Sequence, residues 1–150
     1  ISLSKIKCSF DKAEIVKKKL KELNKLQVDR ILIEENLQSF RSGFSSAKTI
    51  SSLAKFNGIV SYISQSVFSI KPEFVNVIRA RSACGIKINR KSDLSTKEQV
   101  LEWVESSSQF LNYKWPTKVM ASGPRKGMVV KTDQCYDIAD AAVLCLFACN

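Results

Sequence analysis

The stretch VDRILIEE, residues 28–35, decides how the fold of this chain is interpreted. Its apolar and β-branched residues up to Ile33 predict a buried strand of a parallel sheet, which ends at the acidic pair Glu34 and Glu35. Open α/β sheets bind their ligands at the carboxyl ends of strands. Glu34 is therefore a candidate functional residue, although for Glu34 taken singly a surface acid at a strand end is the better explanation.

The segments on either side of this strand predict helices and a second strand. Asp11 is expected to cap a helix whose apolar positions recur at helical spacing, with an outer face of lysines that is typical of a solvated surface. After the strand, a serine-rich loop leads into a helix at 47–63, and residues 74–78 predict another strand.

The second half of the chain predicts two more helices separated by a basic loop. Ser95 or Thr96 is expected to start the first helix, with Glu98 placed for a capping box. A flexible loop follows at 122–127, and the last helix is expected over 133–149. Strands that alternate with helices indicate an α/β domain.

The composition favours a polyanionic partner and excludes several kinds of catalysis. The 150 residues, taken as 1–150, suit one compact domain. Lys and Arg outnumber Asp and Glu by 24 to 14, and the net charge of +10 suits nucleic acid, with acidic proteins and membrane surfaces as alternatives. The absence of histidine removes Ser-His and Cys-His pairs and imidazole zinc sites. Catalysis would therefore depend on carboxylates, lysines, thiols or a bound metal.

The cysteines and the apolar segments bear on the cellular compartment. The five cysteines form no Cys-x-x-Cys pair, and three lie in the apolar C-terminal segment, where cysteine acts as a small core residue. This pattern favours a reducing compartment, either cytoplasm or nucleoid, with the mitochondrial matrix or the cytoplasm of an infected cell as alternatives. No apolar run is long enough to span a bilayer, so no membrane partner is expected.

Three aspartates gather near the start of the expected terminal helix. At about 100° per residue, Asp133, Asp137 and Asp140 fall on one stripe, where like charges repel. Helix capping explains Asp133, and the helix dipole explains Asp137 tolerably. Asp140 lies a turn further in among alanines, where an aspartate is usually partnered. We therefore predict that Asp137 and Asp140 bind a metal ion, with dipole stabilisation as the alternative.

Glu34 would supply a third carboxylate to this metal site. Hard divalent cations such as Mg²⁺ prefer oxygen ligands, and two such ions can activate water and stabilise the leaving oxygen of a phosphodiester without histidine. The interpretation requires that the acid closing the strand meets the two acids of the helix at a shared ion. Side chains that point apart, or a salt bridge that holds one of them within the core, would overturn it.

Four short segments, taken in chain order, form a pattern: VDRILIEE at 28–35, SLAKFNGIV at 52–60, KEQV at 97–100 and DIADA at 137–141. This pattern resembles the RuvC-type Holliday-junction resolvases of the RNase H-like superfamily. In that family the first segment corresponds to the central strand that ends in the catalytic glutamate, and the second and third to later helices. The last corresponds to the final catalytic helix with its Asp-x-x-Asp-Ala motif.

The resemblance implies an RNase H-like mixed sheet flanked by helices and the activity of a crossover junction endodeoxyribonuclease. Such an enzyme is a homodimer that cuts four-way DNA junctions with Mg²⁺ or Mn²⁺. Residue by residue, the resemblance places Glu34, Asp137 and Asp140 at the metal ions and Lys97 at the scissile region.

The resemblance and the basic composition together give a set of residues expected to contact DNA. The aromatic residue that enters the junction would be Phe40 or Phe44, and packing against the following helix explains either one equally well. The full set consists of Phe40, Arg41, Phe44, Arg79, Arg81, Lys87, Arg125 and Lys126.

One motif of the family does not occur in residues 1–150. The family's first catalytic aspartate lies on the first strand, in an Ile-Asp-Pro-type segment, and Asp11 is no substitute because a lysine-rich helix follows it. The resemblance places this missing hairpin before Ile1. Two hypotheses follow: a structure-selective nuclease, or an inactive RNase H-like module that binds nucleic acid within a larger assembly. A nuclease acting on RNA–DNA hybrids is a third interpretation, which the acidic motifs fit less well.

Overall fold

The structure is a computed structural model, and it describes residue 3, residues 5–35 and residues 47–149. Within these residues the chain is a mixed α/β structure with five helices and two small sheets, so the α/β class predicted from the sequence is confirmed. The chain divides into two compact units, Ile1–Asn76 and Val77–Asn150, and each is described by itself.

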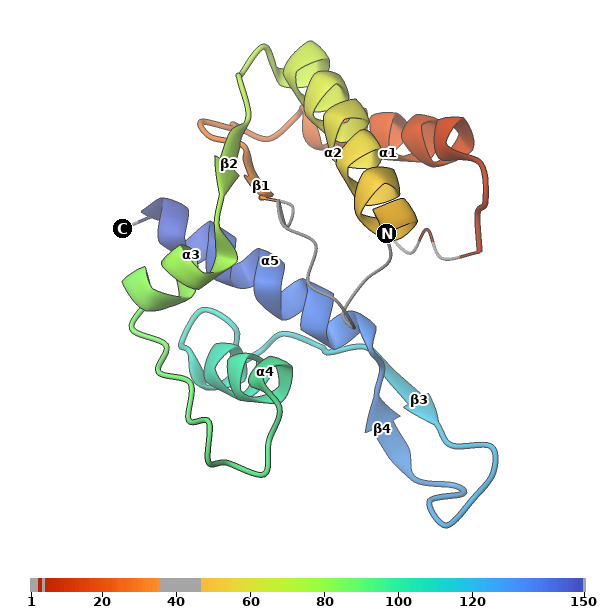
Figure 1. The fold of residues 1–150 in the computed structure, drawn as a ribbon, viewed down its shortest axis with the longest axis vertical. Helices are drawn as coiled ribbons and strands as arrows, with labels where there is room; N and C mark the ends of the chain where they lie inside the picture. Colours follow the sequence, from red (N-terminus) through yellow and green to blue (C-terminus); the bar gives the residue numbers. More distant parts are fainter. Residues whose placement is uncertain (1–2, 4, 36–46, 150) are drawn as a thin grey trace. The chain divides into compact units, whose positions relative to one another are not determined.

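The first unit is a β-α-β arrangement preceded by a helix (Figure 1). Its elements are helix α1 at Ser9–Leu23, strand β1 at Leu32–Glu34, helix α2 at Ala47–Phe68 and strand β2 at Glu73–Val75. The two strands pair in parallel, and the partners are Leu32 with Glu73, Ile33 with Phe74, and Glu34 with Val75. A parallel pair requires a crossover connection, which α2 provides.

Helix α1 packs against α2 through a small apolar face. Ala13 on α1 and Ile63 on α2 are buried, and Lys12 Nζ lies 5.9 Å from the ring centre of Phe56, within the range of a cation–π contact. The other lysines of α1 are exposed, as the sequence predicts: Lys17, Lys18, Lys19 and Lys21.

An ion pair and backbone hydrogen bonds fix the register of the two parallel strands. Arg30 donates from Nε and Nη2 to the two carboxylate oxygens of Glu73 at 3.2 and 3.0 Å. The hydrogen bond from Arg30 and its positive charge hold the pKa of Glu73 below its ordinary value. Glu73 N donates to Ile31 O at 2.8 Å, and Glu35 N donates to Val75 O at 2.9 Å. The pairing is therefore anchored at both ends.

The second unit packs two helices and a hairpin with helix α5. Its elements are α3 at Val77–Ala83, α4 at Thr96–Ser106, β3 at Thr117–Val119, β4 at Val129–Lys131 and α5 at Gln134–Cys149. Both α3 and α4 pack against α5 (Figure 1). The core of this unit contains small and β-branched side chains that are at most 1% exposed: Ala80, Val100, Val104, Cys135, Ala139 and Val143.

Helix α4 begins with the capping box that the sequence predicts. Ser95 Oγ accepts a hydrogen bond from Glu98 N at 3.3 Å, and Glu98 Oε2 accepts one from Ser95 N at 2.7 Å. These two bonds satisfy backbone donors that the first turn of a helix leaves unpaired. Hydrogen bonding to Ser95 also lowers the pKa of Glu98.

The predictions for the first unit are wrong in two details. The N-cap position of α1 is Cys8, whose side chain makes no capping hydrogen bond, and Asp11 lies in the first helical turn. The strand predicted for 28–33 is confined to Leu32–Glu34, and its side chains are half-buried or exposed. Among the described residues β1 pairs with one neighbour, so less of it is covered than in the centre of a wide sheet.

The predictions for the rest of the chain also need correction. The strand predicted for 74–78 ends at Val75, and Ile78 already lies in α3, where Ala80 is fully buried. The loop predicted at 122–127 is present, but the strands β3 and β4 on either side of it were not predicted. The error at 74–78 shows that β-branched residues alone do not separate a strand from a helix that packs on a core.

The cysteines divide between core and surface. Cys135 is fully buried, as expected for a small core residue, whereas Cys145 and Cys149 are exposed. Cys145 lies two residues from buried Val143, which is about 200° around the helix and hence on another face. None of the helices in the described part of the chain combines the length and hydrophobicity that crossing a bilayer requires.

Candidate functional site

Glu34 lies at the carboxyl end of β1, as the sequence predicts. Its side chain is exposed, and its backbone is the last paired position of the strand, opposite Val75. Asn57 on α2 donates from Nδ2 to the backbone oxygen of Glu34 at 3.0 Å. The end of the strand is therefore held both by its neighbouring strand and by the crossover helix.

The aspartates of α5 differ in their surroundings. Helix α5 begins at Gln134, one residue after Asp133, and Asp137 lies exposed in its first turn. Asp140 is half-buried and stands beside Ala139, which is 1% exposed. The stripe predicted from the helical spacing therefore runs from solvent toward the core of the second unit.

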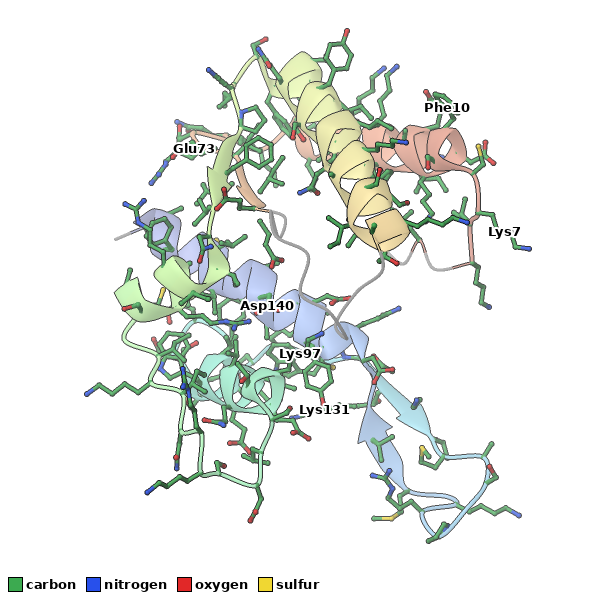
Figure 2. All side chains as sticks on the ribbon, in the orientation of Figure 1. Lys7, Phe10, Glu73, Lys97, Lys131 and Asp140 are labelled. Atoms are coloured by element: carbon green, nitrogen blue, oxygen red, sulfur yellow. The ribbon has the colours of Figure 1, made fainter. Side chains whose placement is uncertain are left out.

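Arg81 on α3 forms an ion pair with Asp140 on α5. Arg81 Nη2 donates to Asp140 Oδ1 at 2.6 Å, and the two side chains are only 15% and 20% exposed. Figure 2 shows Asp140 on the ribbon of α5. Charge-assisted hydrogen bonds of this length are strong, and partial exclusion of water strengthens the attraction further. Asp140 is thus partnered, as an aspartate among alanines requires, and its partner is an arginine.

The contacts around this ion pair join α3 firmly to α5. Cys84 Sγ, just after α3, lies 3.7 Å from the backbone oxygen of Val143, and burial raises the pKa of the Cys84 thiol. Arg81 Nε is buried and has no hydrogen-bond partner among the described residues. The guanidinium therefore interacts chiefly through Nη2, and Asp140 supplies the charge that balances it.

Lys97 lies in the first turn of α4, the helix that packs against α5 (Figure 2). Its Nζ is 6.0 Å from the ring centre of Tyr136, the residue before Asp137, at the limit of a cation–π contact. The Lys97 side chain is exposed, so its ammonium group remains open to an anion. Tyr136 was not among the residues singled out in the sequence, because a lone tyrosine carries no local signal of such a contact.

The residues predicted to contact DNA differ in their surroundings. Arg79 is exposed on α3, and Lys87 is exposed after it. Arg125 and Lys126 are exposed between β3 and β4. Arg81 forms the ion pair with Asp140 described above. Three further candidates lie outside the described residues: Phe40, Arg41 and Phe44.

The carboxylates of α5 fit the chemistry of a hard divalent cation, since Mg²⁺ prefers oxygen ligands. Arg81 is the one hydrogen-bond donor to Asp140 among the described residues, which leaves the second carboxylate oxygen, Oδ2, as an available acceptor. In residues 5–35 and 47–149, no group of three Asp, Glu, Cys or His side chains gathers as metal ligands do. Glu34 belongs to the first unit, and Asp137 and Asp140 belong to the second.

Sequence reasoning missed two interactions that shape these positions. The ion pair of Arg81 with Asp140 joins residues 59 positions apart, and no local pattern encodes such a contact. The bond from Asn57 to Glu34 lies in the SLAKFNGIV segment, where an Asn inside an apolar helix pattern was an available signal. Comparisons of the chain with protein-family models, with curated proteins and with solved structures found no match.

Proposed function

We propose that this chain is a Mg²⁺- or Mn²⁺-dependent endonuclease of RNase H-like fold that cuts branched DNA. In this proposal Glu34, Asp137 and Asp140 bind the metal ions, and Lys97 binds the scissile phosphate. When bound, the metal would activate water and stabilise charge on the leaving oxygen. The chain itself contributes carboxylates and a net charge of +10 that attracts the DNA backbone.

The observation that carries the proposal is the position of Glu34 at the carboxyl end of a parallel strand. Ligands of α/β folds bind at this end of the sheet. Metal binding requires a carboxylate whose backbone is held in place, and Asn57 and the β1–β2 register supply that restraint.

The ion pair between Arg81 and Asp140 favours a second candidate function, nucleic-acid binding without cleavage. Arg81 balances the charge of Asp140, so the burial of Asp140 requires no metal ion. This pair is the kind of contact that counts against a metal role for Asp140. In the nuclease proposal, Arg81 balances the charge of Asp140 when metal is absent, and Asp140 would be one of the residues that hold the ion.

A cleavage assay separates these functions. The substrates are a four-way DNA junction, a linear DNA duplex and an RNA–DNA hybrid, each with Mg²⁺ and with EDTA. The nuclease proposal predicts that the junction is cut in Mg²⁺ and not in EDTA, with little cutting of the duplex. Binding of the junction without cleavage under either condition supports the second function, and preferential cutting of the hybrid supports the third interpretation.

Matched variants assign the activity to particular carboxylates. Glu34→Gln, Asp137→Asn and Asp140→Asn should each abolish cleavage while junction binding persists. The controls are Glu35→Gln, beside Glu34, and Asp133→Asn, one turn before Asp137, and both should retain cleavage. Full activity of Asp137→Asn and Asp140→Asn would remove the α5 carboxylates from the reaction.

The proposal includes a homodimer, because symmetrical cutting of two strands requires two active sites. Light scattering of the chain with and without junction DNA measures the mass directly. A mass of two chains on one junction supports the proposal, and one chain per junction contradicts it.

A further inference from the structure

The segment 114–132, which we call the basic arm, contains five cations and no acidic residue. The cations are Lys114, Lys118, Arg125, Lys126 and Lys131. This density of one charge sign exceeds that of the chain as a whole, in which 14 acids accompany 24 basic residues. The local charge therefore favours a polyanionic partner for this arm.

The basic arm is a two-stranded antiparallel ribbon. Thr117 pairs with Lys131, Lys118 with Val130, and Val119 with Val129. Two further backbone bonds extend the ladder, from Met120 N to Met128 O at 3.0 Å and from Gly127 N to Met120 O at 2.9 Å. Figure 1 shows the ribbon extending away from α3, α4 and α5.

Two turns present the basic residues at the tip of the arm. Lys126 N donates to Gly123 O at 3.0 Å, which closes a turn with Pro124 at its second position. Met128 N donates to Arg125 O at 3.0 Å, and Gly127 in this second turn has a φ of 83°, which favours glycine. Arg125 and Lys126 lie where the two turns overlap, and both are exposed.

The arm is attached at its base and open along its length. Lys131 forms an ion pair with Glu105 on α4, which ties β4 to the helices. Along the ribbon, Val119 is 64% exposed and Val129 is 66% exposed. Lys118 is also exposed, so cations at the tip and on the shaft are available to a partner, in addition to the exposed Lys114 at the base.

We propose that the basic arm binds duplex DNA by laying its two-stranded ribbon along a groove, with Lys118, Arg125 and Lys126 contacting phosphates. The major groove, about 12 Å wide, admits a two-stranded β-ribbon. Paired strands lie about 5 Å apart, so the ribbon fits within that width. This inference deepens the proposed function and rests on its nucleic-acid partner, but it does not depend on cleavage.

The placement of the charges argues against two other partners. A hairpin that inserts into a bilayer needs an apolar tip, whereas Arg125 and Lys126 occupy the tip here and the exposed valines lie on the shaft. Strand pairing between two copies of the arm would bring five cations against five. Duplex DNA fits the charge without either penalty.

The test compares two variants that each remove three positive charges. The arm variant is Lys118→Gln, Arg125→Gln and Lys126→Gln, and the control is Lys17→Gln, Lys18→Gln and Lys21→Gln on α1, where all three lysines are exposed. Binding of a linear duplex is measured in EDTA from 50 to 200 mM salt, so cleavage plays no part. Vesicles containing phosphatidylserine are tested in parallel.

The logarithm of the binding constant falls with the logarithm of the salt concentration, with a slope of about 0.9 per phosphate contact. The three substitutions in the arm variant should therefore make this slope smaller by about 2.7. Over the fourfold range of salt, wild type should therefore lose roughly 40-fold more affinity than the arm variant. The control should follow wild type. The inference would be overturned if duplex affinity fell equally in both variants or if wild type did not bind the duplex. It would also be overturned if the arm variant lost vesicle binding alone. The duplex-binding assay in EDTA does not test the nuclease proposal. Whether the chain cleaves junctions in Mg²⁺ tests that proposal separately.

Discussion

The ion pair between Arg81 and Asp140 makes the most quantitative prediction for the second unit. Replacing Arg81 with Met removes the guanidinium and keeps an apolar stem of similar length. Replacing Asp140 with Asn keeps the shape of the acid and removes its charge. Each single variant leaves one charge without its partner in a place where both side chains are at most 20% exposed. We expect both to destabilise the fold.

The contribution of this ion pair to the free energy of unfolding is expected to lie between two limits. Exposed ion pairs contribute about 0–1 kcal/mol, and removal of one partner from a fully buried pair costs about 3–5 kcal/mol. The exposures of 15% and 20% place this pair nearer the buried limit, and a hydrogen bond to a charged group has a net value of about 1.5–3 kcal/mol. We therefore expect a coupling energy of about 2 kcal/mol.

A double-mutant cycle measures this coupling through urea unfolding of wild type, Arg81→Met, Asp140→Asn and the double variant in EDTA. The pair of Lys19 and Glu22, which is about half exposed, serves as the surface control with Lys19→Met and Glu22→Gln. Its coupling should be much smaller and more sensitive to salt. A coupling below about 0.5 kcal/mol for Arg81 and Asp140 would refute the reasoning, since values in this range are typical of exposed pairs.

Three further predictions concern the core, the capping box and the cysteines. Val104→Ala, in α4, removes fully buried methyl groups and should reduce the free energy of unfolding by about 2 kcal/mol, measured by urea unfolding; a change below about 0.5 kcal/mol would show that the site is not in a packed core. Ser95→Ala should cost about 1 kcal/mol through loss of the cap. The pKa of Glu98 is lowered in the folded chain, so Glu98 stabilises the fold above its ordinary pKa and this stabilisation is lost as the pH falls through the lowered pKa. The free energies of unfolding of wild type and Glu98→Gln should therefore converge in acid. A difference that stays constant across pH would contradict this. Cys145 should react with maleimide much faster than buried Cys135, as followed by mass spectrometry of the folded chain, and equal rates would contradict the assigned burial.

Local signals explain which parts of the fold could be predicted. The capping box of α4 needs only Ser95 and Glu98 three positions apart, and both hydrogen bonds are present. The acid at the end of β1 was also predicted, because an apolar run that stops at a charge marks a strand end. These features depend on residues that are close together in the chain.

The remaining features depend on packing or on pairing at a distance. Val77 and Ile78 have high strand propensity, yet they form α3, where Ala80 packs into the core. The hairpin did have a signal, since Gly123 and Gly127 lie between two short β-branched segments. The partner of Asp140 had none, because 59 positions separate it from Arg81.

Direct metal binding tests the central claim that Glu34, Asp137 and Asp140 are metal ligands. Electron paramagnetic resonance of free Mn²⁺ gives the affinity for the full chain without any need for DNA. We predict that wild type binds Mn²⁺ and that Glu34→Gln and Asp137→Asn each weaken binding, whereas Asp133→Asn does not. Equal Mn²⁺ affinity in wild type, Glu34→Gln and Asp137→Asn would contradict the claim.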